Sequence, residues 1–382
     1  MNRRVNVIGV GMTRFTDLGV GGRFHDLAGE AGRQALQDAG IECCKVEAAY
    51  VGSAYGNYLC GQRGIAELGL SAVPIFDVRN HGASGSTALY RARQAIENGM
   101  ADCVLAIGIE APLPEWARNC WQDHPALDPF ANGLSVSTQL FARAAREYMQ
   151  RYGACKETFA MVAVKSREHA AHNHYALYRQ PLSLEAVLAE EVCEPLTRLQ
   201  YCRPACGAAA VLLCSDEFAR KHAIVDPVYI AAQAMSTDSA SRCNDDTAIC
   251  AVGYDMGFAA ARDVYEQAGI GPEEVDVCEL HDCSTANEIL LYEALGFCRE
   301  GDAEKLVEDG DNTYGGNRVI NPSGGLLSMG HPLGATGLSQ CVELVWQLRG
   351  AAANRQVPHA RIALQHNMSL GEVCVVTMYR RD

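Results

Sequence analysis

The order of predicted secondary-structure elements repeats along the chain, and this repeat constrains the fold more than any other feature. Both copies run strand, helix, strand, turn, helix, strand, the first over 5–214 and the second over 228–378. A helix between two strands is the usual connection of a parallel sheet, with helices packed on its faces. The sequence therefore predicts an α/β fold with two similar halves. The duplication rests on this order alone, because the halves share no obvious sequence identity.

Hydrophobic periodicity and glycine positions set the expected limits of each element. The helix over 24–39 shows the pattern clearly, because its apolar residues share one face and Gly40 follows its last turn. The predicted strands are 5–12, 48–54, 74–78, 103–109, 208–214, 228–232, 275–281, 361–365 and 373–378, and the predicted helices are 24–39, 86–98, 137–152, 257–269, 287–295 and 337–348.

The domain boundaries follow from this order and from the length of 382 residues, which suits two domains. We expect an N-terminal half over 1–220 and a C-terminal half over 221–382. The stretch over about 112–199 has a different character, with two Trp, many His and Tyr, and helical segments. We expect it to be an insertion that lies over the sheet. The polar segment 216–226 is expected to link the two halves.

Composition excludes several classes of function. The net charge of −14 argues against nucleic acid as a main partner, although a local pocket could still bind a small anion. The chain has no apolar run of about eighteen residues, so we expect no membrane span. We also expect no secretory signal, because residues 1–5 lead directly into a strand.

The 17 cysteines are spread along the chain without the spacing of a disulfide scaffold. The nearest approach to a metal-binding pattern is Cys202-x-x-x-Cys206, which lacks a second matching pair. Reduced cysteines that serve as small core residues explain this usage best, so we expect a cytoplasmic protein without a metal site.

Two turns of small residues, at 82–86 and 333–337, each lead into a predicted helix. Free N–H groups and partial positive charge at a helix N-terminus favour an oxyanion or a thiolate. The turn at 82–86, taken alone, is equally consistent with close packing. The second turn follows His331, which has so many small neighbours that we interpret it as a reactive group rather than a core residue.

The sequence His281-Asp282-Cys283 follows a predicted strand and precedes a helix. It therefore lies at the carboxyl end of a strand, where open α/β sheets bind ligands. The alternative is that Asp282 only caps a helix and that its neighbours are incidental. The pair His366-Asn367 also follows a predicted strand, but by itself this pair is more typical of a structural role.

Long motifs in both halves resemble the thiolase superfamily, and their order and spacing match over nearly the whole chain. Two further motifs and the His-Asp-Cys sequence resemble the sterol-carrier-protein-x branch. The superfamily motifs are Asn80-x-x-Ala83-Ser84-Gly85-Ser86-x-Ala88, Asp102-Cys103-Val104-Leu105-Ala106-x-Gly108-x-Glu110, Asn321-Pro322-Ser323-Gly324-Gly325 and Gly330-His331-Pro332-Leu333-Gly334-Ala335-Thr336-Gly337, and the branch motifs are Gly9-Val10-Gly11-Met12-Thr13 and Gly310-Asp311-Asn312-Thr313-Tyr314-Gly315-Gly316.

The resemblance implies a thiolase fold, in which two similar βαβαβαββ-type halves form a five-layer αβαβα core with an inserted loop domain. It implies a transferase that makes or breaks the C–C bond beside a coenzyme A thioester, in the degradation of lipid or aromatic acids. Coenzyme A is then a substrate and no cofactor is permanently bound. A homodimer is expected, and a small zinc-ribbon/OB-fold protein is a plausible further partner.

The same resemblance implies roles for individual residues. His331 would activate the nucleophile and help to bind the thioester oxygen. His281 would belong to the oxyanion hole, and Cys283 would act as acid and base. His366 stands where other thiolases place their second reactive Cys, in a loop that continues to Gly371. Residues Ser323, Gly324 and Gly325 would contact coenzyme A.

The nucleophile position departs from the family pattern, because the reactive Cys falls at Gly82. Glycine has no side chain, so it cannot form an acyl-enzyme. Three explanations stay open: a thiolase whose Cys has been replaced, a Cys-independent retro-aldolase that acts on a β-hydroxyacyl-CoA, and a non-catalytic CoA-binding subunit. The intact His331, His281 and Cys283 favour the first.

Overall fold

The computed structural model describes residues 3–56, 59–70, 72–112, 136–225, 227–237, 247–370 and 373–382. The predicted strands and helices are present, and their limits mostly agree with the sequence patterns within a few residues. Helix α1 (Phe24–Ala39) has the predicted bounds and ends at Gly40, whose φ of 64° is the left-handed conformation that glycine adopts readily.

The N-terminal half contributes five strands in the order β4-β3-β5-β8-β1, and the short β2 (Thr16–Asp17) pairs with β8 outside this order. Strand β3 runs parallel to β4 and β5, whereas β8 is antiparallel to both β5 and β1. The bounds are β1 Val5–Met12, β3 Ala48–Gly52, β4 Ile75–Val78, β5 Cys103–Glu110 and β8 Ala205–Ser215.

The C-terminal half repeats this pattern in the order β11-β10-β12-β13-β9. Strand β10 is parallel to β11 and β12, and β13 is antiparallel to β12 and β9. The bounds are β9 Val228–Thr237, β10 Val277–Glu279, β11 Val319–Ile320, β12 Ile362–Ser369 and β13 Val373–Arg380. The pairing of β1 with β9 joins the halves edge to edge.

The β-α-β units predicted from the sequence account only for the parallel strands of each half. Both sheets are mixed, because their last two strands run antiparallel to the neighbours that they pair with. An antiparallel strand that returns after an insertion, as β8 does, leaves no local signature of its partner in the sequence. The equal pairing patterns nevertheless confirm the two similar halves.

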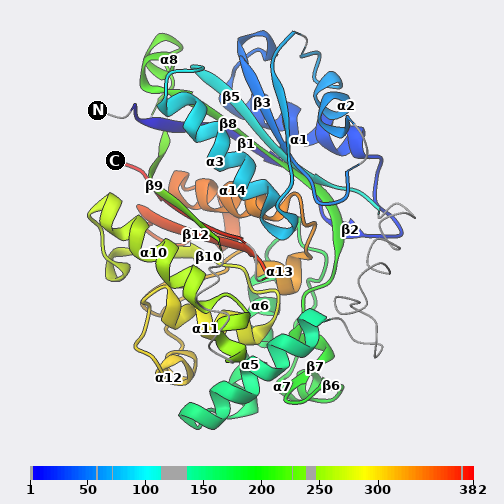
Figure 1. Ribbon diagram of the computed structural model, residues 1–382, viewed down its shortest axis with the longest axis vertical. Coiled ribbons are helices and arrows are strands. Elements are labelled where there is room, and N and C mark those ends of the chain that lie inside the picture. The colour runs from blue at the N-terminus through cyan, green and yellow to red at the C-terminus, as the bar shows by residue number, and fades with distance from the viewer. Residues whose placement is uncertain are drawn as a thin grey trace.

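Helices divide the fold into five layers (Figure 1). Helices α3 (Ser84–Glu97) and α14 (Thr336–Arg349) lie between the two sheets, while α1 covers the outer face of one sheet and α10 (Tyr254–Ala268) that of the other. Neighbouring residues of one strand serve different layers: Ala363 belongs to the central core and Leu364 to the outer core beside α10. The αβαβα core is therefore confirmed.

The insertion packs mainly on helices of the C-terminal half rather than over the sheet. Its helices α5 (Val136–Tyr152) and α6 (Lys156–Ala171) contact α11 (Thr285–Ala294) and α12 (Ala303–Glu308), next to which they are seen in Figure 1. Phe141, Tyr148 and Phe159 share one hydrophobic core with α11. The part of the predicted insertion over 113–135 lies outside the described residues.

Two differences from the predicted elements affect the site or the linker. Strand β12 continues to Ser369, so His366 and Asn367 lie inside a strand and not after it. The predicted strand ended at residue 365, but both residues are buried within β12. The segment predicted to link the halves instead contains helix α8 (Asp216–Lys221), which begins where Ser215 accepts a hydrogen bond from the amide of Phe218.

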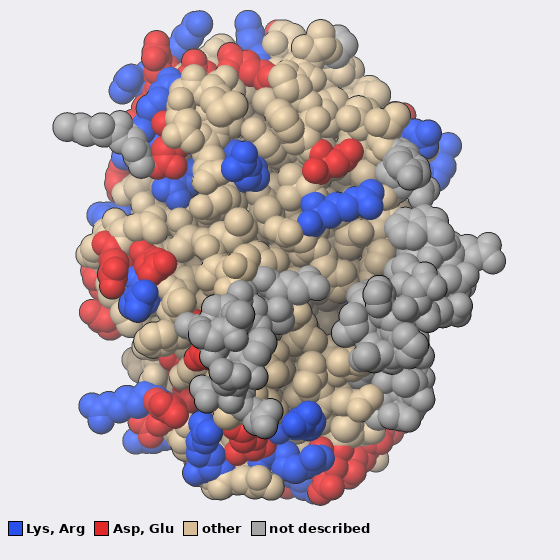
Figure 2. All heavy atoms as spheres, viewed as in Figure 1, with Lys and Arg blue, Asp and Glu red and all other residues tan. Residues whose placement is uncertain are grey.

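The shorter elements complete the described fold. They are β2 Thr16–Asp17, β6 Glu191–Cys193, β7 Leu196–Thr197, α2 Cys60–Ala66, α7 Leu184–Leu188, α9 Ala248–Ala251 and α13 Gly325–Met329, with 3-10 turns at Cys43–Lys45, His81–Ala83, Arg198–Gln200, Pro272–Glu274 and Ala353–Arg355. Within the described ranges, no helix has the length and apolarity needed to cross a membrane. Basic and acidic side chains mix around the rim of the face in Figure 2, without a continuous basic stripe.

Candidate active site

Three loops from distant parts of the chain meet at one place. They are the 3-10 turn His81–Ala83 before α3, the segment 281–284 after β10, and the segment 330–335 before α14. Strand β12 runs beside them, because the backbone oxygen of its Met368 faces Gly82. The two halves of the fold therefore contribute helix N-termini to the same place, and the two small-residue turns lie at these N-termini.

Gly82 faces His331 directly. A Cβ atom built on Gly82 would lie 3.4 Å from Nε2 of His331 and 3.1 Å from the backbone oxygen of Met368. Gly82 is not one of the residues with a positive φ. Its backbone can therefore carry a side chain without the strain of the left-handed conformation. A side chain at position 82 would thus contact the imidazole of His331, with a displacement of a few tenths of an ångström at Met368.

His331 is held at the start of α14. Its Nδ1 lies 2.7 Å from Oγ1 of Thr336, and its backbone amide donates to the carbonyl of Arg203 at 2.8 Å. Burial, followed by the charge of His81, lowers the pKa of His331 to about 3. The imidazole is therefore neutral at pH 7 and can accept a proton from a group at position 82.

His281 completes the centre of the site. Its ring lies edge-on to the ring of His331, with 5.0 Å between the centroids. Its Nδ1 is 3.0 Å from the side-chain nitrogen of Asn367. Burial lowers the pKa of His281 well below its ordinary value, and the charges of His331, His366 and His81 act in the same direction. His281 is therefore also neutral at pH 7.

Cys283 lies close to His281 in sequence, but the described contacts do not join its thiol to either histidine. Its backbone oxygen accepts from the amide of Cys202 at 2.9 Å. Burial, followed by the charges of Cys202 and Asp282, raises the pKa of Cys283 well above its ordinary value. A thiol in this environment suits proton donation better than nucleophilic attack.

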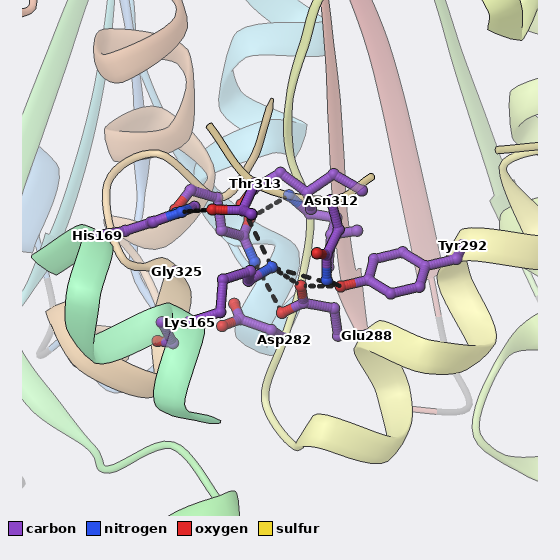
Figure 3. A network of polar contacts seen from close by, with 12 residues as sticks. Lys165, His169, Asp282, Glu288, Tyr292, Asn312, Thr313 and Gly325 are labelled. Atoms are coloured by element: carbon purple, nitrogen blue, oxygen red, sulfur yellow. Dashed lines mark hydrogen bonds and ion pairs between the residues drawn. The ribbon is translucent and has the colours of Figure 1, made fainter. Parts of the chain in front are cut away.

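A buried polar network holds the strand end that precedes His281 (Figure 3). Lys165 of α6 contacts the carboxylate of Glu288 on α11, and this carboxylate accepts from the side-chain amide of Asn321 at 3.2 Å. The oxygen of the same Asn321 side chain accepts from the backbone amide of Leu280 at 2.8 Å. The network therefore links the insertion to the backbone next to His281.

Sequence reasoning missed this network. Lys165 lies in a helix with an ordinary mixed pattern, and the register of α6 against α11 is set only by tertiary packing. His169, one turn after Lys165, bonds to the carbonyl of Asn321 at 2.9 Å and to Oγ1 of Thr313 at 2.7 Å. Thr313 belongs to a motif that we recognised, but no signal in the sequence identified its partner.

Asp282 does not cap the helix that follows its motif, because Ser284 is the N-cap of α11, but it has a structural role at another helix. Its carboxylate accepts from the backbone amides of Leu326 at 2.7 Å and Leu327 at 3.3 Å, in the first turn of α13. Burial, followed by the charge of Glu288, raises the pKa of Asp282 well above its ordinary value. The His-Asp-Cys motif thus contains one structural residue between two candidates for chemistry.

Ser323, Gly324 and Gly325 are buried, and their described contacts are internal. Ser323 donates from its backbone amide and its hydroxyl to Glu279, at 2.9 and 2.8 Å. A Cβ on Gly324 would lie 2.5 Å from Cβ of Ala170, so glycine permits the close approach of α6. The structure gives this loop a packing role, and its contact with coenzyme A stays a prediction.

His366 is fully buried and lies on the face of β12 opposite to Asn367. A Cβ on Gly257 would lie 3.3 Å from its Nε2, so the ring points toward α10. Neither ring nitrogen has a hydrogen-bond partner in the described part of the chain. Burial lowers the pKa of His366 to about 3, so the ring is neutral. Gly371 lies outside the described residues.

Glu110 is a further residue that sequence reasoning quoted only as part of a motif. At the end of β5, its carboxylate accepts from the backbone amides of Ala54, Tyr55 and Gly334 at 3.0, 3.3 and 3.0 Å. Burial raises its pKa to about 7. Glu110 therefore ties the segment after His331 to the N-terminal half of the fold.

Comparison with known proteins agrees with this geometry. The family model "Thiolase, N-terminal domain" matches residues 5–182, and the model "Thiolase C-terminal domain-like" matches residues 232–377. Sterol carrier protein 2 of Bos taurus is 48% identical over 100% of this chain and 73% of its own length. An acetyl-CoA acetyltransferase of Methanothermobacter thermautotrophicus is 38% identical over 99% of this chain and 100% of its own length.

The fold is also similar to solved structures. The complex described as "Ltp2-ChsH2(DUF35) aldolase" matches with a TM-score of 0.85 and 26% sequence identity, over 99% of this chain and 98% of that chain. The similarity covers nearly the whole of both chains.

Proposed function

The chain belongs to the thiolase superfamily, in the branch similar to sterol carrier protein x. From this family membership we propose how the site works with glycine at position 82. The family acts on the C–C bond beside a CoA thioester, and the similarity to acyltransferases supports an acyl-CoA C-acyltransferase. We propose that the site is arranged for thiolysis of a 3-oxoacyl-CoA, and that Gly82 removes only the covalent step.

In this reaction, a thiol at position 82 would give its proton to Nε2 of His331 and attack the 3-keto carbon. The C–C bond to the α-carbon breaks, and its electron pair forms an enolate whose charge rests on the thioester oxygen. His281 donates a hydrogen bond to that oxygen, and Cys283 protonates the carbon. A second coenzyme A then takes the acyl group from position 82.

The observation that carries the proposal is the distance of 3.4 Å between Nε2 of His331 and a Cβ at position 82. A thiol one bond further along that side chain would reach the imidazole. His331 is neutral because burial lowers its pKa, so the ring has a free lone pair; the same burial makes it a weak base, and the thiolate formed beside it would have to stabilise the resulting imidazolium. A helix N-terminus directly after the turn would further favour the thiolate.

The test is to compare the chain with its Gly82→Cys and Gly82→Ala variants. Alanine is the matched control, because it adds the same Cβ against Met368 without a thiol. We expect thiolysis of 3-oxoacyl-CoA thioesters by Gly82→Cys only, with a rate at least about a thousandfold above the parent. Acyl labelling of residue 82 should appear in the same variant. A folded Gly82→Cys variant without either result would contradict the proposal.

A Cys-independent retro-aldol cleavage is a second candidate, and the similarity to the aldolase complex favours it. With glycine at position 82, a β-hydroxyl group could lie beside His331 where a thiol would otherwise stand. His331 would then accept the hydroxyl proton, the C–C bond would break to an aldehyde or ketone, and the same enolate would form. Release of aldehyde or ketone from a β-hydroxyacyl-CoA by the parent, but not by Gly82→Cys, would support this reaction.

A homodimer is part of the proposal. Strand β4 lies at the end of the strand order and, within the described chain, pairs with β3 alone. Its Phe76 is 45% exposed and stacks on Tyr50 of β3, with 4.9 Å between the ring centroids. An open edge strand with an exposed aromatic ring favours pairing with a second copy. Light scattering should show a dimer for the parent and a shift toward monomer for Phe76→Glu.

A small zinc-ribbon/OB-fold partner is also proposed, because the aldolase neighbour was solved as a complex with a DUF35 protein. Co-purification with such a protein encoded alongside this chain would test it. Coenzyme A should bind as a substrate, and the cytoplasmic location stays a prediction. Calorimetry that detects no coenzyme A binding at millimolar concentration, with any partner present, would count against both enzymatic proposals.

A further inference from the structure

We infer that Asn367 is a positioning residue that fixes which ring nitrogen of His281 carries the proton. The inference rests on the proposed function, in which His281 donates a hydrogen bond to the thioester oxygen. A neutral imidazole has one N–H group, so its value as a donor depends on where that proton is. No motif assigned a role to Asn367.

The hydrogen bond between the two residues is fully enclosed. The nitrogen of the Asn367 side chain lies 3.0 Å from Nδ1 of His281, and the two residues are 0% and 4% exposed. An amide nitrogen can only donate, so Nδ1 must accept and cannot carry the proton of a neutral ring. The proton of His281 is then at Nε2, which is the nitrogen left to face a ligand.

The neutral state of the ring follows from its surroundings. His281 is buried, and His331, His366 and His81 are the charged or titratable groups that oppose a positive charge on it. Asp282, the nearest acid in sequence, turns its carboxylate to the backbone amides of α13. A doubly protonated ring would leave Asn367 without an acceptor, so the amide and the burial favour the same state.

The other end of the amide argues against a merely structural role. The oxygen of Asn367 is buried and has no hydrogen-bond partner among the described residues. A buried acceptor without a partner is unfavourable, and an apolar side chain of similar size would avoid that cost. The bond from its nitrogen to His281 is the one described contact that accounts for an amide at this position.

The register of β12 places the amide correctly. Gln365 and Asn367 face the central helices, where Gln365 bonds to Ser86 at 3.0 Å. The intervening His366 faces α10. The next residue, Met368, directs its carbonyl at Gly82. Strand β12 therefore provides both the amide that bonds to His281 and the backbone oxygen that faces position 82. A shift of one residue in its register would turn the side chain of Asn367 to the other face.

The chain offers a matched control for this amide. Gln365 is equally buried, lies on the same face of the same strand and contacts neither histidine of the site. Gln365→Leu and Asn367→Leu each remove a buried amide from this face, and only the second removes the donor to His281; Gln365 makes more hydrogen bonds than Asn367, so its replacement is the stricter control for lost packing. Comparing these two variants separates the effect of lost packing from the effect of moving the proton between the ring nitrogens of His281.

The first measurement uses ¹⁵N-histidine NMR on the chain as it exists, with His281→Asn to assign the signal. Bare and protonated ring nitrogens have well separated ¹⁵N shifts. We expect a bare Nδ1 and a protonated Nε2 in the parent and in Gln365→Leu. In Asn367→Leu, both shifts should move toward their average. A protonated Nδ1 in the parent, or unchanged shifts in Asn367→Leu, would overturn the inference.

The second measurement uses thiolysis kinetics in the Gly82→Cys background. Loss of a partner that orients a reactive group commonly costs about ten- to a hundredfold in activity. We expect that fall in kcat for Asn367→Leu, with KM within about threefold, and less than about threefold change in kcat for Gln365→Leu. Equal losses in both variants would overturn the inference. Complete inactivity of Gly82→Cys would instead refute the proposed function, and the NMR result would still decide the role of Asn367.

Discussion

Replacing Lys165 by methionine should destabilise the protein strongly, because it leaves the carboxylate of Glu288 buried without its cation. The side chains of Lys165 and Glu288 are 7% and 0% exposed. Lys165 also donates to the hydroxyl of Tyr292 and the carbonyl of Ile320, both at 3.3 Å. Breaking a buried ion pair from one side costs about 3–5 kcal/mol. We expect a loss at the lower end of this range, because Tyr292 and Asn321 still donate to Glu288.

The double variant Lys165→Met/Glu288→Met is the control that tests this reasoning. Replacing both members of a buried pair by apolar residues is often close to neutral. We therefore expect the double variant to recover part of the lost stability. It should not recover activity in the Gly82→Cys background, because Asn321 loses the acceptor that orients it toward the backbone of Leu280.

Urea denaturation followed by circular dichroism would give the free energies of unfolding. Thiolysis rates below the unfolding transition would give the effect on the site. If Lys165→Met cost less than about 1 kcal/mol, the buried pair would not stabilise the contact between α6 and α11. If the double variant were as active as Gly82→Cys alone, the network would hold the fold without positioning His281.

Three further predictions follow from other contacts. Burial raises the pKa of Glu110 to about 7 and that of Glu279 to about 8, so these carboxyls lower the stability as the pH rises toward 8, whereas burial lowers the pKa of His169, His331 and His366 to about 3, so these rings lower the stability as the pH falls below about 6.5; stability should therefore be greatest between about pH 6 and 7 and fall toward both pH 5 and pH 8, as urea midpoints would show. His331→Asn should lower turnover in either enzymatic reaction by roughly a hundred- to thousandfold with coenzyme A binding kept within a few-fold, and unchanged turnover in a folded variant would refute its role. Gly324→Ala should lower the melting temperature and cost more than about 1 kcal/mol, because φ is 97° and the new Cβ would meet Ala170 at 2.5 Å; an unchanged melting temperature would mean that α6 can move away.

The elements themselves could be predicted because their signals are local. The apolar stripe and terminal glycine of α1 are properties of consecutive residues, and both ends agree with the structure. The antiparallel return of β8 and the contact of the insertion with α11 depend on partners far away in sequence. The polar residues at the end of β12 misled the strand prediction, because burial by helices from distant segments makes them strand residues.

The candidate site divides in a similar way. His331 and His281 stood out because one lies in a motif of small residues and the other at a strand end, whereas Gly82 was identified only through the resemblance to the thiolase superfamily; the structure brings these three together. His366 stands out equally in sequence, but strand alternation turns its ring away toward α10. Asn367, its neighbour, had no separate signal, although its side chain bonds to the ring of His281.

The sequence by itself determined which residues are available for chemistry and, at Gly82, which one is missing. These are facts of covalent structure that no packing can alter. Only the tertiary structure decided which side chains share one water-excluded space, which nitrogen of an imidazole meets a donor, and which carboxylates are held protonated. Those properties depend on burial and on distances of about 3 Å between atoms of distant segments. Such distances cannot be inferred from local sequence patterns.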